Sequence, residues 1–219
     1  MRILITGSSK GIGLAVTNRF LSLGFDVVGF DLLPSSINNP HYQHYICDIS
    51  KLETLPEVGE IDYLFNNAGL QNSEDDITNN LVGTMNVTKK YGLSKTIKSV
   101  LFNASASARS GFEFDQYVAS KAGIVGYMKH VACLLAKQGA TCNSISFGGV
   151  NTSSNNEVMS DKELWNQIMD VTPLKKWAEL DEVCDWVYFL LVTNKSMSGE
   201  DLLIDNGEKD LNNTFVWPK

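Results

Sequence analysis

Short apolar runs alternate with segments of helical periodicity along most of the chain. Residues 2–6 (RILIT) form the first apolar run, and residues 11–24 follow with hydrophobic positions at helical spacing and a closing glycine. The same alternation continues toward the C-terminal end. It predicts strands at 26–30, 42–48, 61–67, 98–105, 140–146 and 200–207, and helices at 75–93, 115–139, 161–170 and 180–192.

This order of elements predicts the fold class. Strands that alternate with helices need crossover connections, so we expect an α/β protein with a doubly wound, mostly parallel sheet and helices on both faces. The apolar strands fit a sheet that is covered on both sides. Residues 1–219 contain no repeat, low-complexity stretch, linker or shift in composition, so we expect a single domain.

The first apolar run leads directly into a glycine-rich turn, TGSSKGIG at residues 6–13. Glycines at positions 7, 11 and 13 allow a tight turn, close backbone approach and close packing of the next helix on the sheet. The turn then delivers a helix N-terminus, whose free N–H groups attract a pyrophosphate. Its place at the first strand-to-helix crossover favours a dinucleotide-binding turn over a glycine turn without a ligand.

An acidic and a basic residue point to different dinucleotides. Asp31 ends the second predicted strand, where a carboxylate bonds the hydroxyls of the adenosine ribose and repels a 2′-phosphate. No arginine follows it, because the next residues are Leu32, Leu33 and Pro34. Lys10, in the glycine turn, could meet a 2′-phosphate. We weigh Asp31 more and expect NAD(H) to be favoured, with NADP(H) as the alternative.

A tyrosine and a lysine lie four residues apart in DQYVASKAG, residues 115–123. On a helix this spacing puts Tyr117 and Lys121 on one face, and the small residues between and after them are expected to allow close packing. An ammonium beside a phenol favours the phenolate, so we expect a lowered tyrosine pKa and an acid/base group usable near neutral pH. The pair alone is a weak signal, because a helix can carry a tyrosine and a solvated lysine without any function.

Composition and charge exclude several classes of protein. The net charge of -7 argues against a nucleic acid or an anionic membrane surface as the main partner. The longest strongly apolar run, residues 186–192, is too short to span a bilayer, and the N-terminal residues predict a strand rather than a signal peptide. We therefore expect a cytoplasmic protein that binds neither nucleic acid nor membrane.

No metal site is expected. The four cysteines form no Cys-x-x-Cys pair, and we interpret them as buried thiols in a reducing compartment. His41 and His44 lack a nearby carboxylate or third ligand, so we interpret them as loop and strand residues.

Several motifs, in order, resemble the classical short-chain dehydrogenase/reductase family. The glycine turn is similar to the family's Thr-Gly-x-x-x-Gly-x-Gly cofactor turn, and NNAG at 66–69 is identical to the motif after its fourth strand. NLVGT at 80–84 resembles the helix of the catalytic asparagine, and FNASAS followed by YVASK resembles the Ser-Tyr-Lys segment. CDIS at 47–50, FGGVNT at 147–152, PLKKWAELDEV and GEDLLIDNG extend the resemblance over nearly the whole chain.

The resemblance implies a Rossmann-type fold and an NAD(P)-dependent oxidoreductase that interconverts an alcohol and a ketone or aldehyde. Tyr117 would exchange a proton with the substrate oxygen, and Lys121 would hold the nicotinamide ribose and stabilise the tyrosinate. Ser105 would orient the substrate carbonyl or hydroxyl; the other serines of NASASARSG are expected to cap or turn the loop. Asn80 would hold a water that links Lys121 to solvent.

The resemblance also implies a cofactor-binding set and an oligomer. A homodimer or homotetramer would be built on the helices of Asn80 and Tyr117, and the helix segment GYMKHVACLLAKQG has more apolar residues than one buried face requires. Asp48 would meet the adenine. The implied cofactor-binding residues are Gly7, Ser9, Lys10, Gly11, Ile12, Gly13, Asp31, Asp48, Ile49, Asn67, Ala68, Gly69, Tyr117, Lys121, Val150 and Thr152.

The sequence also departs from the family pattern. The segment ISKLETLPEVGE and the stretch from NNAG to Asn80 are short. Phe147 replaces a usual proline, so its ring lines the nicotinamide pocket or packs in the core. Asn206 replaces a frequent glycine, and Leu180 a frequent proline. The polar loop after Val150 offers Met159 and Trp165 as an apolar lid.

Two hypotheses from different classes remain open. The first is the enzyme. The second is a dinucleotide-binding regulatory or interaction protein without turnover, which the complete Asn-Ser-Tyr-Lys set disfavours and the shortened segments keep open. An epimerase or dehydratase of the extended branch is disfavoured by the glycine spacing and the missing longer C-terminal region. Arg109 is either a clamp for a substrate carboxylate or phosphate, or a solvated loop residue.

Overall fold

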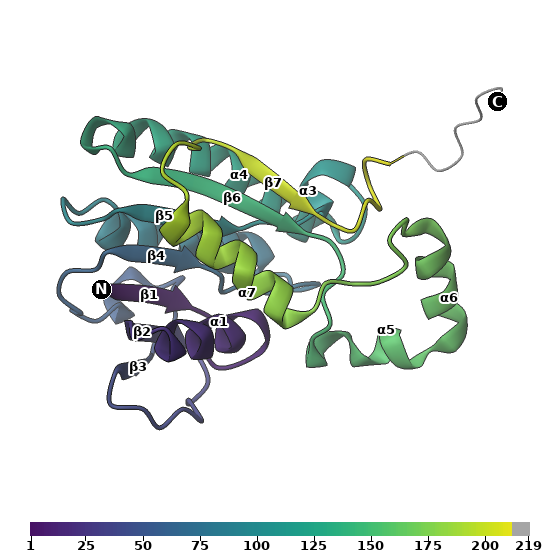
Figure 1. Ribbon diagram of the computed structural model, residues 1–219, viewed down its shortest axis with the longest axis horizontal. Coiled ribbons are helices and arrows are strands. Elements are labelled where there is room, and N and C mark those ends of the chain that lie inside the picture. The colour runs from purple at the N-terminus through teal and green to yellow at the C-terminus, as the bar shows by residue number, and fades with distance from the viewer. Residues whose placement is uncertain (212–219) are drawn as a thin grey trace.

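The computed structural model describes residues 1–211, and within them seven strands form one sheet in which every neighbouring pair is parallel (Figure 1). The strand order is β3-β2-β1-β4-β5-β6-β7, which confirms the predicted fold class. Residues 212–219 of the expected domain lie outside the described residues. The strands are β1 Arg2–Thr6, β2 Asp26–Asp31, β3 Tyr42–Ile46, β4 Tyr63–Asn66, β5 Ser99–Asn103, β6 Thr141–Phe147 and β7 Asp201–Ile204.

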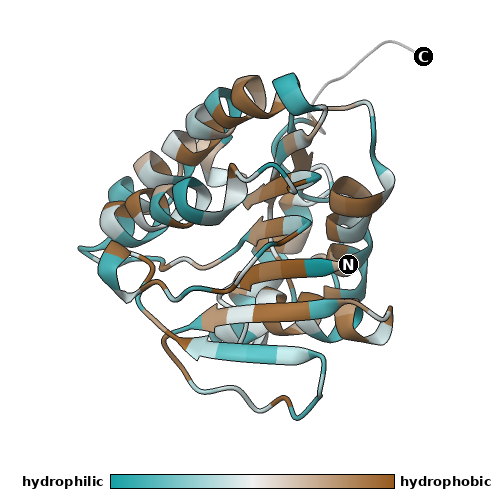
Figure 2. Ribbon diagram, turned by 90° about the vertical axis from the view of Figure 1, so that its left-hand side faces the viewer, coloured by the Kyte–Doolittle hydropathy of each residue, from teal (hydrophilic) through white to brown (hydrophobic). Residues whose placement is uncertain are grey.

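The central strands are apolar because both faces of the sheet are covered. In β1, Ile3, Leu4 and Ile5 are fully buried, and Leu4 is in register with Val28 of β2 and Leu64 of β4. Successive side chains point to opposite faces, so Leu4 joins one hydrophobic cluster while Ile3 and Ile5 join the other. Figure 2 shows these apolar strands in brown at the middle of the molecule.

Helices cover both faces of the sheet. The α-helices are α1 Gly11–Ser22, α2 Thr84–Val87, α3 Ser107–Ser110, α4 Asp115–Leu135, α5 Asn156–Ser160, α6 Lys162–Val171 and α7 Leu180–Tyr188. Single 3-10 turns lie at η1 Leu52–Thr54, η4 Ala136–Gln138 and η5 Ser153–Asn155, and π-helical turns at η2 Ile77–Gly83, η3 Thr88–Gly92 and η6 Phe189–Thr193.

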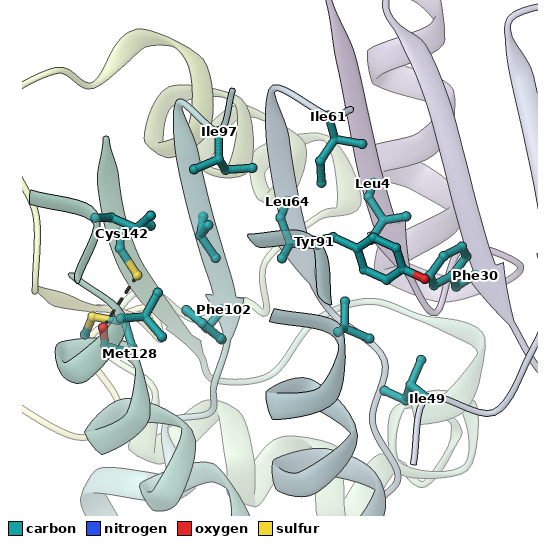
Figure 3. Close-up of a cluster of buried hydrophobic side chains, with 14 of the residues drawn as sticks. Leu4, Phe30, Ile49, Ile61, Leu64, Tyr91, Ile97, Phe102, Met128 and Cys142 are labelled. Atoms are coloured by element: carbon teal, nitrogen blue, oxygen red, sulfur yellow. Dashed lines mark hydrogen bonds between the residues drawn. The ribbon is translucent and has the colours of Figure 1, made fainter. Parts of the chain in front are cut away.

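Each face has its own core. Helices α1 and α7 pack together over one face and bury Val16, Phe20 and Val187. Helix α4 and the continuous helix η2-α2-η3 cover the other face, where Tyr91 and Met128 meet the sheet (Figure 3). The two cores hold the strands rigidly, so the loops at the ends of the strands have fixed starting points.

The structure corrects some of the expected boundaries. The strand predicted at 42–48 ends at Ile46, and the last strand covers Asp201–Ile204 rather than 200–207. Sequence periodicity missed the short helices α3 and α5, because a helix of one turn is too short to show a repeat. Cys133 is exposed, so it is not a buried thiol, unlike the other three cysteines.

The carboxyl ends of all the strands lie at one edge of the sheet. The chain runs outward from β1 to β3 and then returns to β4 on the other side of β1, so the strand order reverses between β1 and β4. In open parallel sheets, ligands bind in the crevice at such a reversal. Helices α5 and α6 lie beyond this edge, to the right of the sheet in Figure 1. Among the helices of residues 1–211, none combines the length and hydrophobicity needed to cross a bilayer.

Candidate active site

The glycine turn after β1 has the geometry that a pyrophosphate site needs. Gly7 and Gly11 have φ of 68° and 53°, where a side chain would be strained. A Cβ on Gly13 would lie 1.9 Å from the Gly7 carbonyl oxygen, so only glycine lets α1 approach β1 this closely. Lys10 lies at the N-cap of α1 and provides no side-chain acceptor for the N–H groups of the first turn. These residues therefore fit an anionic ligand at the helix N-terminus.

The NNAG segment packs directly against this turn. Thr6 Oγ1 accepts hydrogen bonds from the backbone N–H groups of Asn67 and Ala68, at 2.9 and 3.0 Å. Asn67 Nδ2 donates to the Thr6 carbonyl at 3.0 Å, and a Cβ on Gly7 would lie 2.9 Å from Ala68 Cα. Thr6, which sequence reasoning did not select, therefore joins the first and fourth strands at the edge of the site.

Asp31 lies beside the glycine turn, at the end of β2. Its Oδ2 accepts a hydrogen bond from Ser9 N and its Oδ1 accepts one from Leu33 N, both at 2.9 Å. A carboxylate oxygen has a second lone pair, so Asp31 can still accept a hydroxyl while these backbone groups hold its orientation. Ser9 and Asp31 are therefore brought together as the sequence predicts, whereas Lys10 is exposed.

Asp48 is engaged within its own turn. Its Oδ1 accepts from Ser50 N at 3.0 Å and from Ser50 Oγ at 2.6 Å, and its Oδ2 lies 3.2 Å from Lys51 Nζ. The hydrogen bond from the Ser50 hydroxyl is the largest influence that lowers the pKa of Asp48. The next residue, Ile49, is buried against Gly83, where a Cβ would lie 2.7 Å from the Ile49 side chain.

Asn80 is fully buried in η2, and its side chain holds the loop that follows NNAG. Its Oδ1 accepts from Leu70 N at 2.7 Å, and its Nδ2 donates to the Leu70 carbonyl at 2.9 Å and to Ser120 Oγ at 3.0 Å. The side-chain amide therefore fixes the position of the 69–70 segment. A Cβ on Gly69 would lie 3.1 Å from Asn80 Oδ1 and 3.5 Å from Lys121 Nζ, so these two side chains meet at Gly69.

Tyr117 and Lys121 lie one turn apart on α4, as their spacing predicts. The Lys121 ammonium is 5.6 Å from the centroid of the Tyr117 ring and donates a hydrogen bond to the Asn103 carbonyl at 2.8 Å. Only 4% of Lys121 is exposed. Asn103, at the end of β5, also donates to Asn67 Oδ1 at 3.0 Å, so it connects the lysine to the NNAG segment.

The pKa of Tyr117 is raised, which corrects the expectation that Lys121 lowers it. Burial is the largest cause, the Ser105 hydroxyl lowers the value, and the carboxylates of Glu113 and Asp76 raise it. Burial also lowers the pKa of Lys121 to about 8. The ammonium lies over the face of the ring and donates its hydrogen bond to a backbone carbonyl rather than to the phenol oxygen.

The two serines that begin the segment before α4 are both buried. Ser105 is 7% exposed, its Oγ lies 2.9 Å from Ser107 Oγ, and it accepts from Ser107 N at 3.2 Å. Ser107 therefore opens α3 and orients Ser105, while Ser110 accepts from Phe112 N in the turn that follows. The Ser105 hydroxyl also lowers the pKa of Tyr117, so it faces the tyrosine, while its role toward a substrate stays a prediction.

The loop after β6 closes over the glycine turn. Val150 forms a parallel bridge with Ala178, and Thr152 Cγ2 would lie 4.0 Å from a Cβ on Gly11. Phe147, which replaces proline, is buried in the core beneath this loop. Trp165 of the expected lid lies edge-on against Trp177, with ring centroids 5.0 Å apart.

Arg109 is exposed, but it lies in α3 rather than in a loop, and its guanidinium is ion-paired rather than free. Its Nε donates to Asp201 Oδ2 at 3.0 Å, which joins α3 to β7. Asp201 is further held by Ser144 and Ser146 of β6. Only some of the small residues in α4 allow close packing. Gly123 lets α4 pack on Leu81, whereas Ala119 and Ala122 are exposed.

The structure thus gathers the predicted site residues at one edge of the sheet. Sequence reasoning missed Thr6 and Asn103, which join the strands and hold Lys121. Both are polar residues that end an otherwise apolar strand, and this is the signal that could have identified them.

Comparisons with known proteins identify the family of this chain. The family model described as enoyl-(acyl carrier protein) reductase matches residues 7–209. The chain belongs to the short-chain dehydrogenase/reductase family. Members of this family are NAD(P)-dependent oxidoreductases.

Individual relatives cover nearly the whole chain. A short chain dehydrogenase, ausX, of Penicillium brasilianum is 27% identical over 93% of this chain and 94% of its own. The solved structure of a 4-hydroxyisoleucine dehydrogenase complexed with NADH is 26% identical, with a TM-score of 0.85 over 96% of this chain and 99% of its own. ElxO with NADP bound shares the fold, with a TM-score of 0.84 at 24% identity over 94% of this chain and 98% of its own.

Proposed function

We propose that the protein interconverts a small-molecule alcohol and the corresponding ketone or aldehyde, with NAD(H) favoured as the redox cofactor. The observation that carries this proposal is the meeting of two sets of residues at one sheet edge. The glycine turn offers a helix N-terminus that could take a pyrophosphate, and Tyr117 lies close to both the Lys121 ammonium and the Ser105 hydroxyl. A bound nicotinamide would supply or accept the hydride.

The chain's own residues would bind, orient and move the proton. Ser105 is positioned to donate a hydrogen bond to the substrate oxygen, and Tyr117 to give that oxygen a proton as charge develops on it. Because burial raises the pKa of Tyr117, the hydroxyl is protonated at neutral pH, the form that carbonyl reduction needs. Lys121 would hold the ribose hydroxyls, with Asn103 and the Asn80-held loop keeping the ammonium in place.

A substrate screen tests the reaction class. Panels of carbonyl compounds with NADH or NADPH, and of alcohols with the oxidised cofactors, are followed by nicotinamide absorbance. At least one panel is expected to show turnover, and the Tyr117→Phe protein should turn over the same panel about 10²–10⁴-fold more slowly. Tight cofactor binding without turnover on any panel would favour the regulatory protein instead.

Asp31 is expected to make the protein bind NADH more tightly than NADPH. Its carboxylate is held by Ser9 N and Leu33 N beside the glycine turn. There it would accept the hydroxyls of the adenosine ribose and repel a 2′-phosphate. Asp31→Ala should therefore improve NADPH affinity and weaken NADH affinity in fluorescence titrations. Tighter binding of NADPH by the wild type would show that Lys10 outweighs Asp31.

The protein is expected to form a homodimer or homotetramer through the helices of Asn80 and Tyr117. Val82, Leu93 and Leu134 lie on or next to these helices and are exposed, between 36% and 41% of each. Covering such apolar side chains favours self-association. Light scattering at micromolar concentration should give a multiple of the chain mass, and a single monomer mass would overturn the expectation.

A further inference from the structure

A buried carboxylate next to the site has an oxygen without a partner. Asp76 is fully buried, immediately before η2. Its Oδ1 accepts a long hydrogen bond from Ser73 N, at 3.3 Å, and its Oδ2 has no hydrogen-bond partner among the described residues. Burying a carboxylate is costly unless a hydrogen bond or an opposite charge compensates it. Asp76 therefore needs a partner that this hydrogen bond does not supply.

The position of Asp76 directs it toward the active site. Its backbone is already helical, with φ of −55° and ψ of −41°, and it lies four residues before Asn80. The two side chains consequently share one face of the helix. That face meets α4, because Asn80 bonds Ser120 and reaches Lys121 at Gly69.

Lys121 is a buried cation that lacks a carboxylate hydrogen-bond partner among the described residues. It is a buried ammonium whose hydrogen bond goes to a neutral carbonyl, that of Asn103. We propose that Asp76 is a positioning residue of this site, whose buried carboxylate keeps the Lys121 ammonium charged in spite of its burial. This inference rests on the proposed function, because a charged Lys121 is what the ribose hydroxyls and the tyrosinate require.

Electrostatics agrees with the geometry. Burial lowers the pKa of Lys121, and the carboxylate of Asp76 is the influence that raises it. Asp76 acts on Lys121 and Tyr117 of α4, Glu113 of the preceding loop also acts on Tyr117, and Glu74 and Asp75 are the charged residues next to Asp76 on its own segment. Glu113, Glu74 and Asp75 are all exposed, so solvent screens them far more than it screens Asp76.

The consequence is a defined pH range for cofactor binding. A dinucleotide held by the Lys121 ammonium should bind more weakly as pH rises through the lysine pKa, which is about 8 in the wild type. Without the carboxylate, burial acts on the lysine alone and its pKa falls further. The decline in affinity should then begin at lower pH, by on the order of one unit.

NADH titrations by fluorescence, between about pH 6 and 10, test the inference without any substrate. Asp76→Asn keeps the side-chain shape and removes the charge, and Asp76→Glu keeps the charge. Asp75→Asn removes the neighbouring exposed carboxylate and serves as the matched control. Asp76→Asn should bind NADH severalfold more weakly than wild type at pH 8 and nearly as well at pH 6. In Asp76→Glu and Asp75→Asn, the pH at which NADH affinity begins to fall should stay close to that of the wild type.

Each outcome has one meaning. If Asp76→Asn weakens binding equally at every pH, or lowers only the unfolding temperature, Asp76 is a structural residue and the inference is overturned. If Asp76→Asn does not fold, Asp76→Ser, which leaves room for water, is tested for the same shift. A wild-type protein that binds neither NADH nor NADPH overturns the proposed function itself, whereas normal wild-type binding with an unshifted variant overturns only the role of Asp76.

Discussion

Tyr117→Phe is expected to lose turnover by about 10²–10⁴-fold while cofactor affinity stays close to wild type, because general acid–base catalysis contributes on that order. The substitution removes only the hydroxyl and keeps the ring beside Lys121. Hydride transfer to a carbonyl builds negative charge on oxygen, and in this variant no positioned proton would meet it. Measuring kcat and cofactor Kd separately shows which step is lost.

Lys121→Ala is the comparison that separates the two roles. It should lose turnover and cofactor affinity together if Lys121, which lies over the Tyr117 ring, holds the nicotinamide ribose as proposed. A Tyr117→Phe protein with undiminished kcat, on a substrate that the wild type turns over, would remove Tyr117 from the mechanism.

Gly13→Ala is expected to destabilise the protein strongly and abolish dinucleotide binding. The added Cβ would lie 1.9 Å from the Gly7 carbonyl oxygen and 2.7 Å from Asn67 Nδ2, so the backbone of α1 or of the turn must move. Overpacking of this kind costs about 1–3 kcal/mol and more when the obstacle is backbone. Displacing α1 would also remove its N–H groups from the pyrophosphate position. Thermal unfolding and NADH titration measure the two effects.

Gly126→Ala is the matched control. Gly126 also lies inside a helix, α4, but a Cβ there would meet no atom within 4 Å. Replacing an exposed helical glycine by alanine favours the helix by about 0.5–1 kcal/mol. If the two substitutions change the unfolding temperature equally, the close contact at Gly13 is not what destabilises Gly13→Ala.

The fold could be predicted from the sequence because its strands are buried on both faces. The apolar runs at β1, β2 and β5 are unambiguous, and the helices between them enforce parallel order. One-turn elements such as α3 could not be predicted, since a single turn has no periodicity. Asn206 replaces a frequent glycine without loss of the turn: its φ is 58°, a conformation that asparagine adopts more readily than most residues.

Site residues could be selected from the sequence, but their electrostatics could not. The four-residue spacing of Tyr117 and Lys121 correctly predicted that the two side chains lie on the same face of a helix. It could not give the burial that raises the tyrosine pKa, nor the Asn103 carbonyl that takes the lysine's hydrogen bond. Both depend on residues distant in the chain: Asn103 ends β5, 18 residues before Lys121, and Ser105 and Asp76 both act on the tyrosine. The ion pair of Arg109 could not be predicted either, because its partner Asp201 lies far along the chain, on the last strand.

Label transfer tests the central claim most directly. The protein is incubated with NADH that carries deuterium at both C4 positions of the nicotinamide and with the best carbonyl compound from the screen, and the product is analysed by mass spectrometry. If the protein is a hydride-transferring oxidoreductase, the alcohol should contain a single deuterium on the carbinol carbon, and Tyr117→Phe should form it far more slowly. Tight NADH binding with no deuterium in any product across the carbonyl panel would contradict the account and identify a binding protein without turnover.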